Sequence, residues 1–162
     1  MPVCRLAKLS FLQGCAAEAM IEQITAEDCY ELRESILRPN QPRENWTFDT
    51  DDDPRSIHLA FKQAVEVVGV VSLLPEPHPE YPDHPWRLRG MAVREDLQGQ
   101  GIGQKLMQGL RERVSGDGIW CTARKRVHGF YLQNGFEIVA DEFTMNDMAH
   151  VTMLTHSSNG DA

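Results

Sequence analysis

The hydrophobic pattern of the chain consists mainly of short apolar runs separated by polar breaks, and it predicts a domain rich in strands. Residues 65–74 are nearly all apolar and rich in valine, as in a central strand that is covered on both faces. Residues 56–61 instead alternate, with apolar side chains on one face and His58 on the other, which is typical of a half-buried strand. The short link between these two runs allows a hairpin.

Two segments without any hydrophobic period separate the apolar runs and predict loops. Residues 38–56 contain three prolines and five acidic residues, and a connection of this length suggests a function or mobility. Residues 75–85 contain five prolines, so they form neither a helix nor a central strand. The other expected strands cover residues 20–24, 86–93, 119–123, 136–143 and 150–156.

Apolar residues at helical spacing predict three helices. The first covers residues 25–37, where Thr25 and Asp28 resemble a capping box. In residues 102–114 an apolar side chain recurs every four positions, which is one face of an amphipathic helix. The third helix ends at Gly135, which is expected to be left-handed. The element order β-α-loop-β-β-β-α-β-α-β-β then predicts an α/β fold of the mixed α+β kind, in which helices flank both faces of a mixed, mostly antiparallel sheet.

Length and composition indicate one globular domain, which we place at residues 20–156. The chain has 162 residues, of which 41% are hydrophobic and 25% charged, and both values are typical of a single soluble domain. We expect residues 1–19 to be an extension outside the core and residues 157–162 to be a flexible tail.

The charge and the cysteines narrow the possible partners. A net charge of −8 argues against nucleic acid or an anionic membrane as the main partner and is compatible with a cationic substrate. No apolar run approaches the ~20 residues of a membrane span. The four cysteines lack C-x-x-C spacing, so we expect free thiols in a cytoplasmic protein and no metal site; they are Cys4, Cys15, Cys29 and Cys121.

The glycine-rich segment QGQGIG, residues 98–103, lies where a predicted strand ends and a helix begins. It is not a dinucleotide fingerprint, because Gln104 stands where the third glycine belongs. It is not a P-loop either, because the glycine and the hydroxyl residue of that motif are both absent. Free N–H groups at a helix start favour a phosphate. The glycines alone leave open whether they bind an anion or only form a tight turn.

Two blocks together resemble the GNAT superfamily of N-acetyltransferases. Within residues 91–107, Gln98, Gly101 and Gly103 match the family signature Q/R-x-x-G-x-G/A, and residues 130–136 match its aromatic-tyrosine block, which ends in Gly-Phe. The resemblance covers about residues 20–156 and points to a small bacterial subgroup whose substrates are mostly undefined. It implies acetyl-CoA as the acyl donor.

The resemblance also implies roles for individual residues. Tyr131 would protonate the departing CoA thiolate as the catalytic general acid, whereas its helical position by itself indicates a core aromatic residue. Arg124 stands where many members have an asparagine that contacts the pantetheine arm. The main chain of one strand would pair with that arm, and the N–H groups of the glycine segment would hold the pyrophosphate; these residues are Met91, Ala92 and Val93, then Gln98, Gly99, Gln100, Gly101, Ile102 and Gly103.

The implied reaction is acetyl transfer to the primary amine of a small molecule or a protein by direct attack. The alternatives are a catalytically silent acyl-CoA sensor and an interaction protein without a CoA site. The general base stays open among His58, His128, His150 and a water chain. We expect the acidic run at residues 49–53 to be a solvated loop. The alternative is that it attracts a polyamine or an aminoglycoside. Homodimers are common in the family. We expect core or rim packing for Trp46, Trp86 and Trp120.

Overall fold

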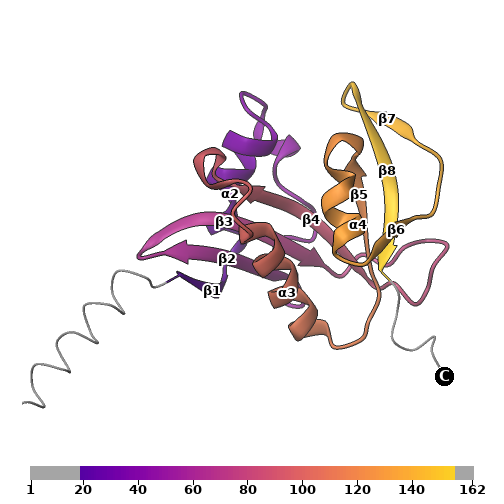
Figure 1. The fold of residues 1–162 in the computed structure, drawn as a ribbon, viewed down its shortest axis with the longest axis horizontal. Helices are drawn as coiled ribbons and strands as arrows, with labels where there is room; N and C mark the ends of the chain where they lie inside the picture. The colour runs from indigo at the N-terminus through magenta and orange to yellow at the C-terminus, as the bar shows by residue number, and fades with distance from the viewer. Residues whose placement is uncertain (1–18, 156–162) are drawn as a thin grey trace, which may run out of the picture.

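The computed structural model describes residues 19–155, which form one mixed sheet with helices on both faces (Figure 1). The strand order is β1-β2-β3-β4-β5-β8-β6, and β7 pairs with β8. Every pairing is antiparallel except that of β4 with β5. The strands are β1 (Ala19–Ile24), β2 (Ile57–Gln63), β3 (Glu66–Leu74), β4 (Trp86–Val93), β5 (Ile119–Arg124), β6 (Phe136–Ile138), β7 (Phe143–Met145) and β8 (Met148–Thr155).

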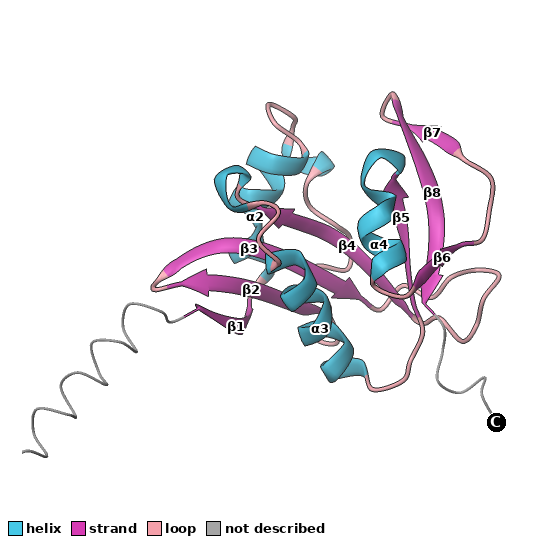
Figure 2. Ribbon diagram, in the orientation of Figure 1, coloured by secondary structure: helices cyan, strands magenta, loops and turns pink. Residues whose placement is uncertain are grey.

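The helices confirm the predicted placement on the two faces of the sheet. The helix α3 (Ile102–Val114) and the short α4 (His128–Gln133) pack on one face, and α2 (Ala26–Leu32) with the π-helical turn Arg33–Leu37 covers the other (Figure 2). The Thr25 hydroxyl accepts from the N–H of Asp28, and the Asp28 carboxylate accepts from the N–H of Thr25, so the predicted capping box is present. The predicted fold class is therefore confirmed.

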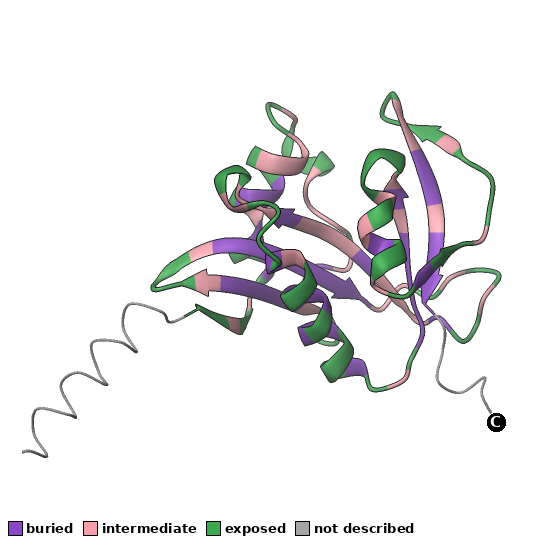
Figure 3. Cartoon of the chain, in the orientation of Figure 1, coloured by how far each residue is buried: buried purple, intermediate pink, exposed green. Residues whose placement is uncertain are grey.

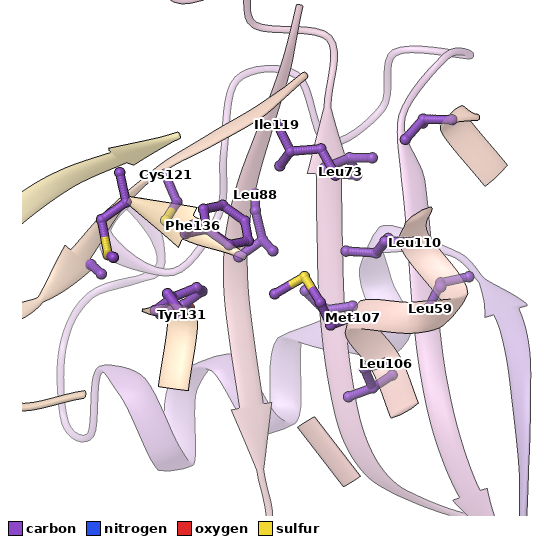
Figure 4. Packing of buried hydrophobic residues seen from close by; sticks show 14 of the residues in the cluster. Leu59, Leu73, Leu88, Leu106, Met107, Leu110, Ile119, Cys121, Tyr131 and Phe136 are labelled. Atoms are coloured by element: carbon purple, nitrogen blue, oxygen red, sulfur yellow. The ribbon is translucent and has the colours of Figure 1, made fainter. Parts of the chain in front are cut away.

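The larger hydrophobic core lies between α3, α4 and the sheet. Leu106 and Leu110 of α3 are fully buried against Leu59 and Leu73 (Figure 4). The outer face of α3 is exposed, as the amphipathic pattern predicts (Figure 3). A smaller core under α2 contains Cys29. The sheet is thus covered on both sides along its central strands.

The strands β4 and β5 pair only at their beginnings and then diverge (Figure 1). Their register joins Trp86 to Ile119 and Arg87 to Trp120 and goes no further. In β4 the pairing with β3 shifts register around Gly90, which has a φ of +65°. A Cβ there would stand 2.9 Å from the Arg33 Nε, so both conformation and space require glycine. Beyond this bulge, the edge of β4 toward β5 has no strand partner.

Two predictions about the strands are wrong in detail. The strand β2 is buried on both faces, because α2 and the loop after it cover the side that carries His58 and Ala60. The predicted strand 136–143 is interrupted: β6 and β7 both pair with β8, at opposite ends of it, and residues 140–142 leave the sheet between them. The acidic Asp141 and Glu142 are exposed there.

Some expectations fall partly outside the described residues. Ala19 begins β1, whereas the rest of the proposed extension and the proposed tail are not described. Cys29 and Cys121 are free and buried, as expected, and Cys4 and Cys15 lie outside the described part. Between residues 19 and 155 no helix is long and apolar enough to cross a membrane.

Candidate functional site

A cavity of about 170 Å³ opens where β4 and β5 separate. Successive side chains of a strand point to opposite faces of the sheet, so the residues of β4 and β5 that line the cavity belong to both faces. Leu88, Cys121 and Ala123 belong to the core shared with α3 and α4, whereas Arg87 and Arg89 occupy the alternate positions on β4. The residues that line the cavity therefore come from both faces of the sheet.

Tyr131 of α4 borders this cavity and is also part of the core. Its ring lies edge-on to Phe130 and Phe136, with centroids 5.2 Å and 5.4 Å away, and Figure 4 shows it near Cys121. Burial raises the pKa of the Tyr131 phenol well above its usual range. The hydroxyl therefore stays protonated at neutral pH and can donate a proton. Gly135, with a φ of +84°, ends the helix as predicted.

The glycine segment leaves an open helix start. Gly101 is the N-cap of α3 with a φ of +84° and offers no side-chain cap. A Cβ at Gly99 or Gly101 would meet no atom within 4 Å. The N–H groups of residues 101–103 have no hydrogen-bond partner within residues 19–155. This start of α3 thus combines free donors with the positive end of the helix dipole.

Gly103 has a packing role that the sequence did not reveal. A Cβ there would come within 3.2 Å of the Phe130 ring and 3.6 Å of the Met91 sulfur, so its small size lets α3 approach α4 and β4. Gln98 has a positioning role, because its side-chain amide donates to the Val93 carbonyl at 2.9 Å and ties the loop to the end of β4. Both residues therefore shape the segment in addition to any contact with a ligand.

A buried polar network lies behind the cavity, and sequence reasoning missed its centre. Arg33 is fully buried and donates to both oxygens of Asp51 at 2.8 Å and 2.9 Å and to the Ser72 hydroxyl at 2.8 Å. Asp51 lies in the acidic run that was expected to be solvated, and for this residue the expectation is wrong, because Arg33 draws it inside. An arginine inside a helical stripe gives no periodic signal that its charge will be buried.

The three candidate histidines differ clearly. His58 is buried, and its ring nitrogens contact the Ser72 hydroxyl at 2.6 Å and the Asp51 carbonyl at 2.9 Å, so neither is free. His128 contacts the Lys125 carbonyl and does not line the cavity. His150 lines the cavity, and its Nδ1–H donates to the Met148 carbonyl at 2.8 Å. That bond leaves the lone pair of the neutral ring on Nε2.

His150 and Arg124 lie on the same side of the sheet. They are direct cross-strand partners in the β5–β8 ladder, so their side chains project from one face. Arg124 lines the cavity and donates to the Leu37 carbonyl at 2.6 Å. Trp46 also lines the cavity. Trp86 and Trp120 have packing roles, as expected, with indole bonds to Asp117 and to the Glu76 carbonyl.

Comparison with known proteins agrees with this geometry. The acetyltransferase (GNAT) domain family matches residues 54–138. Bacillus subtilis YitI, described as an uncharacterized N-acetyltransferase, is 30% identical over 138 residues, which are 82% of this chain and 93% of that protein. The crystal structure of Escherichia coli ElaA is 18% identical with a TM-score of 0.71, over 86% of this chain and 100% of that one.

The fold also matches a solved structure that contains coenzyme A. An aminoglycoside 6′-N-acetyltransferase complexed with coenzyme A is 17% identical with a TM-score of 0.62, over 84% of this chain and 96% of that one. The family match spans more than half of the chain, and the relative is similar over most of both sequences. The chain therefore belongs to the GNAT superfamily of acetyltransferases and is an acetyl-CoA-dependent acyltransferase.

Proposed function

We propose that the protein transfers the acetyl group of acetyl-CoA to the primary amine of a small molecule or a protein by direct attack, with Tyr131 as the general acid. The observation that carries this proposal is the position of Tyr131. Its neutral phenol borders the same cavity as the unpaired edge of β4 and the face that carries His150. A proton donor and a proton acceptor thus border one space from different elements.

The acyl donor would bind along β4 and at the start of α3. The pantetheine arm has amide groups, which can pair with the main chain of Met91, Ala92 and Val93 at the open edge as a neighbouring strand would. The pyrophosphate would accept from the N–H groups of residues 99–103, where two glycines leave the space clear. Arg124 stays a prediction as a pantetheine contact, because one side of its guanidinium already donates to Leu37.

The chemical step needs a polarised thioester, a neutral amine and a protonated leaving group. An N–H of residues 91–93 would donate to the carbonyl oxygen as negative charge develops there. The amine nitrogen forms the new C–N bond, the C–S bond breaks, and the Tyr131 proton passes to the sulfur. The Nε2 of His150 would take the proton that the amine loses, because His150 is the candidate histidine that lines the cavity and its Nδ1 is already bonded to the Met148 carbonyl.

The first test is thermal unfolding of the purified protein with acetyl-CoA, with desulfo-CoA and NAD as companions. A ligand that binds only the folded state at 100 times its Kd adds about 2.7 kcal/mol to the free energy of unfolding. We expect a clear rise of Tm with acetyl-CoA and none with NAD. Thiol release with a panel of amines then separates an enzyme from an acyl-CoA sensor, which would bind without turnover. No rise at millimolar acetyl-CoA would remove the proposal.

A further inference from the structure

The residues that line the cavity carry positive charges without an equal number of negative ones. Its lining contains five arginines and no acidic residue, although the whole chain has a net charge of −8. One of the five, Arg33, is neutralised by Asp51. The net charge of the chain is thus opposite in sign to that of its cavity. The other four arginines are Arg38, Arg87, Arg89 and Arg124.

Among the described residues, one carboxylate lies within ion-pair distance of any of these four guanidinium groups. The Glu76 Oε1 lies 3.8 Å from Arg87 and 4.0 Å from Arg89, which are ion-pair distances too long for hydrogen bonds. Within residues 19–155, the Arg124 guanidinium has the Leu37 carbonyl as its hydrogen-bond partner and no ion pair. Arg38 has a buried Nη1 that finds no partner in the described part of the chain. Several N–H donors therefore have no protein acceptor in the cavity wall.

Aromatic rings hold two of these guanidinium groups in place before any ligand binds. The Arg89 guanidinium carbon lies 3.9 Å from the centre of the Phe48 ring, and that of Arg87 lies 4.6 Å from the centre of the Trp120 ring. Stacking of this kind keeps a planar group in one orientation. A preorganised pair of forks is suited to an oxyanion with two or more oxygens.

The arginines also disturb one another. Burial, and then the neighbouring Arg87, lower the pKa of Arg89 to about 10. Burial, and then Arg38 and Arg126, lower the pKa of Arg124. Both shifts have the direction expected where positive charges lie close together without enough counter-charge. An added anion would relieve this repulsion.

We propose that the acceptor carries an oxyanion, a carboxylate or a phosphate, close to its amino group, and that Arg38, Arg87 and Arg89 bind it. This inference rests on the proposed acetyl transfer. Arg87 and Arg89 project from β4 on the face of α2, opposite the α3 face that offers the glycine segment. The donor's pyrophosphate would therefore occupy a different place from the acceptor's anion. The cationic wall would also disfavour an ammonium ion and favour the neutral amine that attacks.

The test uses matched amines that differ only in the group beside the amine. The first set is 3-aminopropanoate, O-phosphoethanolamine and 3-aminopropanamide, and the second is the twenty standard L-amino acids with their carboxamides. Release of CoA thiol from acetyl-CoA gives kcat/KM for each compound. We expect at least one anionic compound to exceed its uncharged partner by about 10-fold or more, and the first set tells a carboxylate from a phosphate.

Two variants and a control then assign the preference to the cavity. Arg38→Gln and Arg89→Gln are expected to lower kcat/KM for the anionic compound by roughly 10- to 150-fold, the range for hydrogen bonds to charged groups, and so to abolish most of the anion preference, while the KM for acetyl-CoA stays unchanged. Arg55→Gln removes the same charge from an exposed ion pair with Asp53 and is expected to keep the preference. Because the buried Nη1 of Arg38 has no partner within residues 19–155, its loss breaks no hydrogen bond of that atom there, and this variant carries the test even if Arg89→Gln fails to fold.

The outcomes separate the two proposals. If acetyl-CoA raises Tm but anionic and uncharged compounds perform alike, whether both react or both fail, the inference about the acceptor is wrong and acetyl-CoA binding stands. An anion preference that survives in Arg38→Gln and Arg89→Gln also overturns it. If acetyl-CoA gives neither a Tm rise nor thiol release, the proposed function itself falls and takes this inference with it.

Discussion

Tyr131 combines two demands in one side chain, because it belongs to the core and also borders the cavity. The Tyr131→Phe variant keeps the ring and removes only the proton donor. We expect kcat to fall by roughly 10²–10⁴, the range for general acid–base groups, with an unchanged Tm. Thiol release measures kcat, and Tyr81→Phe, which alters a phenol away from the cavity, is the control. A Tyr131→Phe enzyme with full turnover would rule out the assigned role.

His150 is expected to matter most when the amine is still protonated. The His150→Gln variant should lower kcat/KM by roughly 10²–10⁴ near neutral pH. The deficit should shrink as the pH approaches the amine's own pKa, because the solvent then supplies the neutral amine. A kcat/KM profile from pH 6 to 10 measures this. His128→Gln, which changes a histidine outside the cavity, should follow the wild-type profile, and a deficit that is constant with pH would contradict the role of His150.

At the residue scale, the sequence predicts which residues match a functional motif more easily than it predicts which side chains surround them. Tyr131 and the glycine segment could be recognised because their spacing matches a family motif. The burial of Arg33 could not be predicted, because it depends on an aspartate eighteen residues later and on a serine of β3. His150 could not be chosen over His58 from alternation alone, because β2 turns out to be covered on both faces.

At the scale of elements, the Arg33–Asp51 pair fastens the long loop after α2 to the back of the cavity. Asp51 also accepts from the Phe48 N–H at 2.8 Å, and Phe48 stacks on Arg89. The loop therefore orders the side of the cavity on which we propose that the acceptor binds. Its length was predicted from composition, but its anchoring was not, because a single buried contact leaves no pattern in the sequence.

Removing this anchor should destabilise the protein strongly. The Asp51→Asn variant leaves Arg33 buried with its positive charge uncompensated, and we expect a loss of about 3–5 kcal/mol in the free energy of unfolding. Urea denaturation measures the loss. Asp53→Asn, in the same acidic run but paired with the exposed Arg55, should change stability little. Equal effects of the two variants would show that the buried pair has no special weight.

At the scale of the whole molecule, the antiparallel order of β2, β3 and β4 and the helices on both faces followed from alternating runs and short connections. The place of β8 between β5 and β6 did not, because the strand–helix–strand pattern of β5, α4 and β6 predicted a parallel pair there. The bulge of β4 at Gly90 could not be predicted either, because the space there is set by Arg33, far away in the sequence. The interruption between β6 and β7 was also missed, since an apolar run gives no sign that two halves will pair with opposite ends of one strand.

The two buried thiols predict how stability changes in alkali. Burial raises the pKa of Cys29 to about 11 and that of Cys121 to about 12. Above about pH 9 the unfolded chain loses these protons while the folded protein keeps them, so the free energy of unfolding falls as the pH rises. Each thiol should contribute roughly 1.4 kcal/mol per pH unit. Urea denaturation at pH 8, 9 and 10 under reducing conditions measures the slope, which Cys121→Ala should reduce; an equal slope would contradict the argument.

The short parallel contact between β4 and β5 divides the sheet into two half-sheets. In the described sheet, two residue pairs join the half formed by β1 to β4 to the half formed by β5 to β8, and the core under α3 and α4 contacts both halves. An acyl-CoA arm laid along the open edge of β4 would act as a removable strand that ties the halves together. The protein would then be more rigid with acyl-CoA bound. It would be more mobile between turnovers, when acceptor and product exchange.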